Sequence, residues 1–194
     1  MTLVRTHRVH SGRVISLDID TVRFPNGNVG DLEMIRHPGA SAVLPFLDDL
    51  ELPDPRVLLI RQYRHATGGW LWEIPAGRRE PGESPEATAH RELAEETGYR
   101  AEQLQRLTSI WTTPGFTDEV IHLFLASRLS PGAMAHEADE ILELHPTPWS
   151  TALRMVKDGV IMDTKTATAI LFVQCHLRNA GDSSPDHPSA RGPR

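Results

Sequence analysis

Cysteine, long apolar runs and an excess of positive charge are all scarce or missing in this chain of 194 residues. Its one cysteine, Cys175, excludes an internal disulfide framework and a cysteine-based zinc cluster, and its apolar helical surroundings predict a buried, inert thiol. No apolar run approaches the ~20 residues that a bilayer requires, so we expect no membrane-spanning helix and no membrane partner. Residues 1–14 lack the apolar stretch of roughly 7–15 residues that a secretory signal carries. We therefore expect a cytoplasmic protein.

Acidic residues outnumber basic ones, with 26 Asp and Glu against 20 Lys and Arg and a net charge of −6. This balance disfavours a general nucleic-acid binder, which needs a basic surface for phosphate contacts. The hydrophobic fraction of 39% and the charged fraction of 24% are typical of a folded globular chain. The length suits one domain of ordinary size.

Alternating polar and apolar residues in the first 45 positions predict half-buried strands, with a hairpin turn at residues 25–28. Four consecutive aliphatic residues within 57–63 indicate a central strand that is buried on both faces. Further strands are predicted at about 31–37, 42–46, 105–110 and 120–127.

Helix-start and helix-stop residues mark three helices. Ser84 is a suitable N-cap, Pro85 fits the first helical position, and Gly98 suits the left-handed position just past the end. A second helix begins after residues 147–148 and ends at Gly159, and Asp163 caps a third that runs to about residue 177. Residues 179–194 lack large apolar side chains and are expected to form a disordered tail. This order of elements predicts a single α/β (α+β) domain.

The first of these helices carries three glutamates on one face. Glu92 and Glu96 are four residues apart, hence about 40° apart around the helix, and Glu95 lies beside them. A solvated acidic face is the simpler interpretation of such a group. The alternative is a site for a hard divalent cation such as Mg²⁺ or Mn²⁺, which prefers oxygen ligands.

The wider pattern favours the cation site. Residues 77–99 read GRREPGESPEATAHRELAEETGY. Seven fixed residue types at these spacings match by chance, at a given start, with odds on the order of one in 10⁸. The segment resembles the signature box of the Nudix hydrolases, except that Tyr99 stands where an aliphatic residue is usual. The resemblance implies a small-molecule nucleoside diphosphate as substrate and Mg²⁺ or Mn²⁺ as cofactor, with two or more ions per site.

The same resemblance assigns roles to single residues. Glu92 and Glu96 match the principal metal ligands, Glu95 matches an auxiliary one, and the carbonyl of Ala76 matches a further oxygen ligand. Residues 91 and 83, an arginine and a glutamate, match a pair that braces the helix against the loop before it.

Segments outside the box resemble the ADP-ribose pyrophosphatase branch of the family. Pro114 follows Gly98 by 16 residues, and the chain contains a QYR segment at 62–64 and an E-x-PAG segment at 73–77. The branch implies an α/β/α sandwich with a mixed central sheet and an N-terminal antiparallel strand extension. It also implies that ADP-ribose is cleaved to AMP and ribose 5-phosphate.

Three further residues are expected to bind the substrate. Arg64, in the QYR segment, matches a basic residue of the branch, although a surface strand arginine is the simpler interpretation. Glu73 and Gly115 belong to the other two matching segments. The attacking water is often deprotonated by a glutamate outside the box, for which Glu140 is the first candidate and Glu137 the second; either of them could instead be ordinary loop charge.

Members of this branch are usually homodimers that exchange N-terminal strands. We accordingly expect residues 1–40 to be a dimer-exchange region, residues 41–178 the Nudix domain and residues 179–194 the tail. Arg36 and His37 stand where a basic residue of a second copy would reach the substrate. Relatives often stack the adenine on an aromatic residue of this region, and here Phe24 is the one candidate among the first 40 residues.

Two alternatives remain open at this point. The first is a Nudix pyrophosphatase that acts on another nucleoside diphosphate sugar or on a dinucleotide. The second is a non-catalytic domain that senses a nucleotide, which is less compatible with a full set of box carboxylates.

Overall fold

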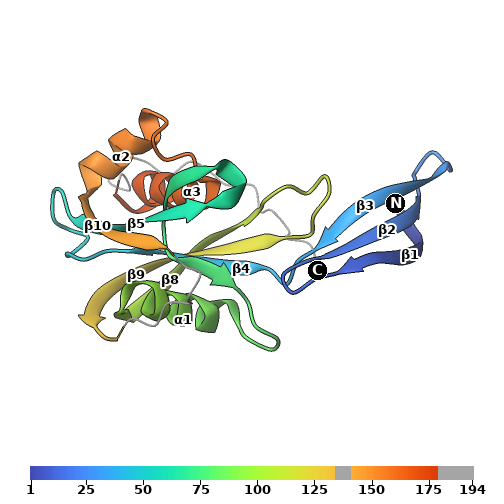
Figure 1. Cartoon of the computed structure of the whole chain (residues 1–194). Coiled ribbons are helices and arrows are strands. Elements are labelled where there is room, and N and C mark those ends of the chain that lie inside the picture. Colours follow the sequence, from blue (N-terminus) through green and yellow to red (C-terminus); the bar gives the residue numbers. More distant parts are fainter. Residues whose placement is uncertain (134–140, 179–194) are drawn as a thin grey trace.

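The computed structural model describes residues 1–133 and 141–178. Residues 137 and 140, both candidate bases, and the expected tail at 179–194 lie outside these ranges. The N-terminal part is a three-stranded antiparallel sheet in the order β1-β2-β3, which projects from one end of the body (Figure 1). It consists of β1 (Thr2–Ser11), β2 (Ser16–Arg23) and β3 (Val29–Arg36).

The body contains two further sheets. The larger one has the order β7-β4-β9-β8, and in it β4 runs parallel to β9 while the other pairs are antiparallel. The smaller one has the order β10-β5-β6 and is antiparallel. The strands are β4 (Ala40–Pro45), β5 (Arg56–Arg64), β6 (Gly69–Glu73), β7 (Ala76–Arg78), β8 (Tyr99–Trp111), β9 (Val120–Pro131) and β10 (Leu142–Pro148).

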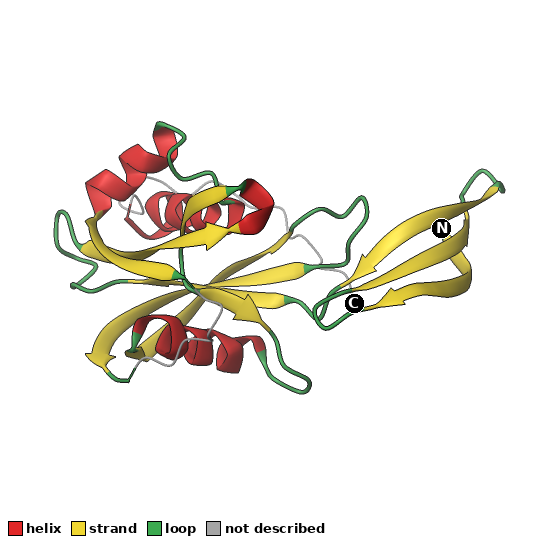
Figure 2. Cartoon of the chain, in the orientation of Figure 1, coloured by secondary structure: helices red, strands yellow, loops and turns green. Residues whose placement is uncertain are grey.

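Helices lie on opposite sides of these strands (Figures 1 and 2). The helix α1 (Pro85–Thr97) covers one side, and α2 (Trp149–Lys157) and α3 (Thr164–Val173) cover the other. A short 3₁₀ helix (His65–Thr67) joins β5 to β6, and a π-helical turn (Gln174–Arg178) follows α3. The result is the layered, mixed-sheet architecture that was expected.

Local signals fixed the ends of the helices as predicted. The Ser84 hydroxyl accepts a hydrogen bond from the amide of Ala87 at 3.1 Å, and Gly98 has a φ of 71°. At the start of α3, the Asp163 carboxylate accepts a hydrogen bond from the amide of Thr166 at 3.0 Å. These caps satisfy amide groups that have no partner inside a helix.

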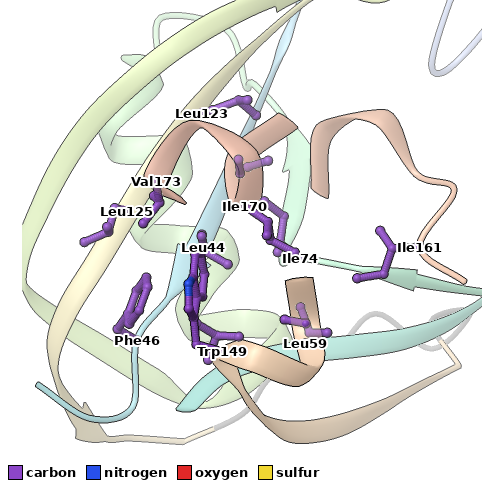
Figure 3. Packing of buried hydrophobic residues seen from close by; sticks show 14 residues of the cluster. Leu44, Phe46, Leu59, Ile74, Leu123, Leu125, Trp149, Ile161, Ile170 and Val173 are labelled. Atoms are coloured by element: carbon purple, nitrogen blue, oxygen red, sulfur yellow. The ribbon is translucent and has the colours of Figure 1, made fainter. Parts of the chain in front are cut away.

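The main hydrophobic core lies between the strands and the helices α2 and α3 (Figure 3). All six residues of β4 are buried, as is the aliphatic run of β5. Phe46 packs against Trp149 with ring centroids 5.3 Å apart, which ties the end of β4 to the start of α2. A smaller cluster, which includes Leu93 and Phe124, holds α1 against the larger sheet. The apolar side of α1 is therefore packed against the larger sheet, and its acidic side faces β7.

Ion pairs add to the backbone pairing of the three N-terminal strands. Asp18 and Asp20 are 2% and 7% exposed, and both bind the guanidinium of Arg36 on β3. Arg8 on β1 also pairs with Asp18. They connect β2 with both β1 and β3, and all ten residues of β1 are exposed.

The structure differs from the sequence predictions in four respects. The strand β1 is exposed along its whole length rather than half-buried. The short strands β6 and β7 were not predicted, and β8 starts immediately after Gly98 rather than near residue 105. The prediction of a buried Cys175 was wrong, because the residue is exposed in a π-helical turn that contains no buried residue. Within the described ranges, no helix combines the length and apolar character needed to cross a membrane.

Candidate active site

The glutamates of α1 meet the strand β7 across a buried contact. Glu96 is 2% exposed and its Oε2 accepts a hydrogen bond from the amide of Ala76 at 3.0 Å. Glu92 is 7% exposed, and the side chain of Glu95 lies nearer the solvent. The structure thus brings Glu96 into contact with Ala76, which lies 20 residues earlier in the sequence.

Gly77 is required by the position of the Glu92 carboxylate. A Cβ atom added to Gly77 would lie 1.9 Å from Oε1 of Glu92 and 2.0 Å from its Cδ. Real Cβ atoms do not approach other heavy atoms so closely, so any side chain here would displace the carboxylate. The bare Cα of Gly77 therefore lets a buried acid lie directly against the backbone of β7.

Arg91 lies at the centre of the carboxylates. Its Nε and Nη2 donate to Glu83 at 3.0 Å each, and its Nη1 donates to Glu92 at 2.6 Å and to Glu95 at 2.9 Å. Nη2 also donates to the carbonyl oxygen of Arg78 at 3.0 Å. The expected brace between residues 91 and 83 is present, and it extends to two of the predicted metal ligands.

These contacts change the acidity of the groups that make them. The hydrogen bonds from Arg91 are the main reason why the pKa of Glu83 falls to about 2 from its ordinary value of 4.5. Glu83 also accepts hydrogen bonds from the amide of Glu80 and the hydroxyl of Thr88. The pKa of Arg91 is raised further above its ordinary value, chiefly by the same hydrogen bonds.

The donor set has the chemistry that a hard divalent cation prefers. It offers carboxylate oxygens from Glu92, Glu95 and Glu96 and the carbonyl of Ala76. In the described residues, however, no three His, Cys, Asp or Glu side chains are arranged so that they could already hold an ion. Arg91 instead binds two of the carboxylates, so a cation would compete with its guanidinium for them.

A second charged cluster lies at the end of β6. Glu73 is 1% exposed and accepts two hydrogen bonds from Arg64, one from Nε at 2.8 Å and one from Nη2 at 2.9 Å. Lys165 also donates to Glu73, and it donates to Asp163 at 2.9 Å. Burial raises the pKa of Glu73, but the bonds from Arg64 and the charge of Lys165 outweigh it and hold that pKa below its usual value.

Lys165 is a member of this cluster that the sequence did not reveal. It is buried and lies 92 residues away from Glu73 in the chain. The pKa of Arg64 is raised above its ordinary value, first by its hydrogen bonds to Glu73, and the negative charge of Glu96 contributes. Arg64 is therefore close enough to the α1 carboxylates for their charge to act on it. Its bonds to Glu73 use Nε and Nη2 and do not involve Nη1.

The predicted substrate residues Arg36, His37 and Gly115 belong to a third group. The loop that contains Gly115 docks on the end of β3, where the amide of Ile35 donates to the carbonyl of Phe116 at 2.7 Å. Asp118, from the same loop, accepts from the amide of His37 at 2.8 Å and from Arg36 at 3.4 Å. The structure thus brings these three predicted residues together, but among Asp18, Asp20 and Asp118 rather than among the α1 glutamates.

The brace between Glu83 and Arg91 predicts a pH-dependent contribution to stability. Glu83 has a lower pKa in the folded chain than in the unfolded one, so its contribution is complete above pH about 4.5 and is lost as the pH falls towards 2. We expect Glu83→Gln to lower the free energy of unfolding by roughly 1–3 kcal/mol at pH 7. The difference from the unsubstituted chain should narrow below pH 4.5, as measured by urea unfolding.

The matched control is Glu86→Gln, on the exposed side of the same helix. It should change stability by less than about 0.5 kcal/mol at every pH. A gap between Glu83→Gln and the unsubstituted chain that stayed constant from pH 7 to pH 3 would contradict the assigned ion pair.

Comparison with known proteins places this geometry in a family. The NUDIX domain model matches residues 36–165. An ADP-ribose pyrophosphatase from Bacillus subtilis (strain 168) is 40% identical over 173 residues, which cover 88% of this chain and 91% of the relative. A methanol dehydrogenase activator from Bacillus methanolicus has the same identity and coverage.

A solved structure has the same fold. The structure described as an ADP compounds hydrolase aligns with a TM-score of 0.79 at 23% sequence identity, and covers 93% of this chain and 95% of its own. This similarity confirms the predicted mixed α+β architecture. The chain belongs to the Nudix family, as the glutamate box around Arg91 predicted.

Proposed function

We propose that the chain is a cytoplasmic, divalent-metal-dependent enzyme that hydrolyses the pyrophosphate bond of ADP-ribose to AMP and ribose 5-phosphate. The observation that carries the proposal is the buried pair Glu92 and Glu96 against the bare backbone of Ala76 and Gly77. Sequence identity to an ADP-ribose pyrophosphatase supports the choice of substrate.

The relative named for the activation of methanol dehydrogenase is equally similar in sequence. Sequence identity is therefore the same to a relative named as a pyrophosphatase and to one named as an activator. The complete set of box carboxylates favours catalysis, because a domain that only binds a nucleotide has no need for three acids on one face.

The residues of the site would have separate roles in metal binding, substrate binding and proton transfer. Mg²⁺ or Mn²⁺, when bound, neutralises phosphate oxygens and lowers the pKa of a water molecule. Glu92, Glu95, Glu96 and the Ala76 carbonyl would hold it. Arg64 would bind the pyrophosphate through Nη1, since Glu73 already fixes the orientation of the guanidinium. Glu140, or else Glu137, would accept the proton of the attacking water.

Turnover of a small substrate panel tests this proposal. With Mg²⁺, we expect kcat/KM for ADP-ribose to exceed that for GDP-mannose, UDP-glucose, NADH and diadenosine polyphosphates at least tenfold, which corresponds to about 1.4 kcal/mol. Glu96→Gln should lower kcat by orders of magnitude with an unchanged circular dichroism spectrum, because it removes one carboxylate charge from the cation site. Gly77→Ala should act similarly by displacing the Glu92 carboxylate.

EDTA should abolish the activity, and Glu86→Gln should preserve it. A preference for another panel member would leave the chemistry intact and refute the assigned substrate. No turnover of any compound would refute the enzymatic proposal and favour a nucleotide-sensing domain.

The two candidate bases are distinguished by single substitutions. If Glu140 accepts the proton of the water, Glu140→Gln should lower kcat roughly 10²–10⁴-fold with little change in KM. Glu137→Gln, three residues away in the same segment, serves as the control and should retain most of kcat. The reverse order would assign the role to Glu137, and near-normal kcat in both variants would exclude the segment.

We further propose that the chain forms a homodimer through its N-terminal sheet. All ten residues of β1 are exposed, including Leu3, Val4 and Val9 at 57%, 53% and 50%. This strand lies in a sheet that projects from one end of the body, so its three apolar side chains remain in contact with water (Figure 1). A second copy that covered it would remove this apolar surface from water.

Light scattering tests the dimer. At micromolar concentration we expect about twice the chain mass of 21.6 kDa. The double substitution Val4→Glu and Val9→Glu should weaken association at least tenfold, since it introduces charge into the apolar contact. Val160→Glu should not, since Val160 is similarly exposed at 47% but lies beyond α2. A monomer of the unsubstituted chain at all working concentrations would contradict the proposal.

A further inference from the structure

A cavity of about 520 Å³ lies between the N-terminal sheet and the loop that follows β7. Its walls come from the connection between β1 and β2 (residues 12–16), from residues 36–38 after β3, and from residues 78–81. The volume is within the range of small-molecule sites, roughly 300–1,000 Å³. Neither the α1 glutamates nor Arg64 lines it, whereas the predicted substrate residues Arg36 and His37 do.

The lining of this cavity is positive in a chain whose net charge is −6. Arg13, Arg36, Arg78 and Arg79 contribute guanidinium groups, while Glu80 is the one carboxylate among the lining residues. A concave surface of one sign concentrates ions of the opposite sign. The cavity is therefore suited to an anion.

Two of these arginines are oriented by backbone oxygens. Arg79 donates from Nε and Nη2 to the carbonyl of Glu83 at 3.2 and 2.7 Å, and Arg78 donates from Nη1 to the carbonyl of Arg13 at 2.7 Å. A carbonyl fixes the direction of a guanidinium but does not neutralise its charge. Arg36 differs, because its charge is compensated by the buried carboxylates of Asp18 and Asp20.

We propose that this cavity is a binding site for a phosphate group, held by Arg78 and Arg79. The planar fork of arginine matches the oxygens of a phosphate, and groups that are already oriented lose little entropy on binding. The ligand is inorganic phosphate or a phosphomonoester. The choice of AMP and ribose 5-phosphate as candidate ligands rests on the proposed function. The positive charge of the cavity is independent of that function.

The cavity is linked to the catalytic cluster by the backbone between Gly77 and Arg79. The carbonyl of Arg78 accepts a hydrogen bond from Arg91, and the neighbouring Gly77 lies against Glu92. A phosphate bound to Arg78 and Arg79 would therefore act on the loop that positions the metal ligands. This arrangement fits a site for a product of the reaction.

Isothermal titration calorimetry in EDTA tests the site without any turnover. Inorganic phosphate, AMP and ribose 5-phosphate are titrated separately, and we expect at least one to bind with one ligand per chain. Arg78→Ala combined with Arg79→Ala should weaken that binding at least tenfold. Arg79→Lys, which keeps the charge and loses the fork, should give an intermediate affinity. Tighter binding of AMP or ribose 5-phosphate than of phosphate would identify a product as the ligand.

The control variant is Arg154→Ala, an exposed arginine on α2, which should bind as the unsubstituted chain does. Thermal unfolding by circular dichroism shows that each variant is folded. The proposal is overturned if none of the three compounds binds, or if the double variant keeps full affinity. Binding that is lost in Arg64→Ala but kept in the double variant would place the phosphate in the catalytic cluster and also overturn it. Intact binding without hydrolysis of ADP-ribose would refute the proposed function alone.

Discussion

The repulsion among the carboxylates of the Nudix box is the constraint on which the rest of the site depends. Two like charges 4 Å apart repel by about 4 kcal/mol at an effective dielectric constant near 20, and Glu92 has little access to water. Arg91 offsets this repulsion by bonding to Glu83, Glu92 and Glu95 simultaneously. Because it also binds the carbonyl of Arg78, the same guanidinium fixes the loop before the helix. A divalent cation would take over part of this role, and Arg91 would keep Glu83.

The cluster around Glu73 also contains a buried carboxylate whose charge is compensated by cations. Glu73 is more deeply buried than Glu92, and it is compensated by two cations, Arg64 and Lys165. Lys165 is in turn held by Asp163, the N-cap of α3. The helix α3 therefore supplies the second cation for Glu73, the carboxylate that orients Arg64 on β5.

Local features of the sequence predicted more of the molecule than its long-range contacts did. The helix α1 and its caps, the buried strand β5 and the glutamate box are encoded within short segments, where capping, periodicity and spacing act directly. The strands β6 and β7 are short and lie beside glycines and prolines, so their pairing partners define them rather than their own residues. Lys165 could not be assigned to the site, because its partner Glu73 is 92 residues away. Cys175 was predicted to be buried because the helix before it is apolar, but that helix ends at Val173 and the turn that follows has no buried residue.

Gly77 separates two regions of opposite charge. On one side lie the carboxylates of α1, and on the other lie the arginines of the cavity, with Arg78 and Arg79 directly after the glycine. Substitution of this residue would push Glu92 away from the backbone, so the chain must keep it bare, and a bare residue gives the loop conformational freedom. Arg91 on the first side and the carbonyl of Glu83, bound to Arg79 on the second, remove that freedom. Glu83 binds Arg91 through its carboxylate and Arg79 through its carbonyl. It therefore connects the carboxylates on one side of Gly77 with the arginines on the other.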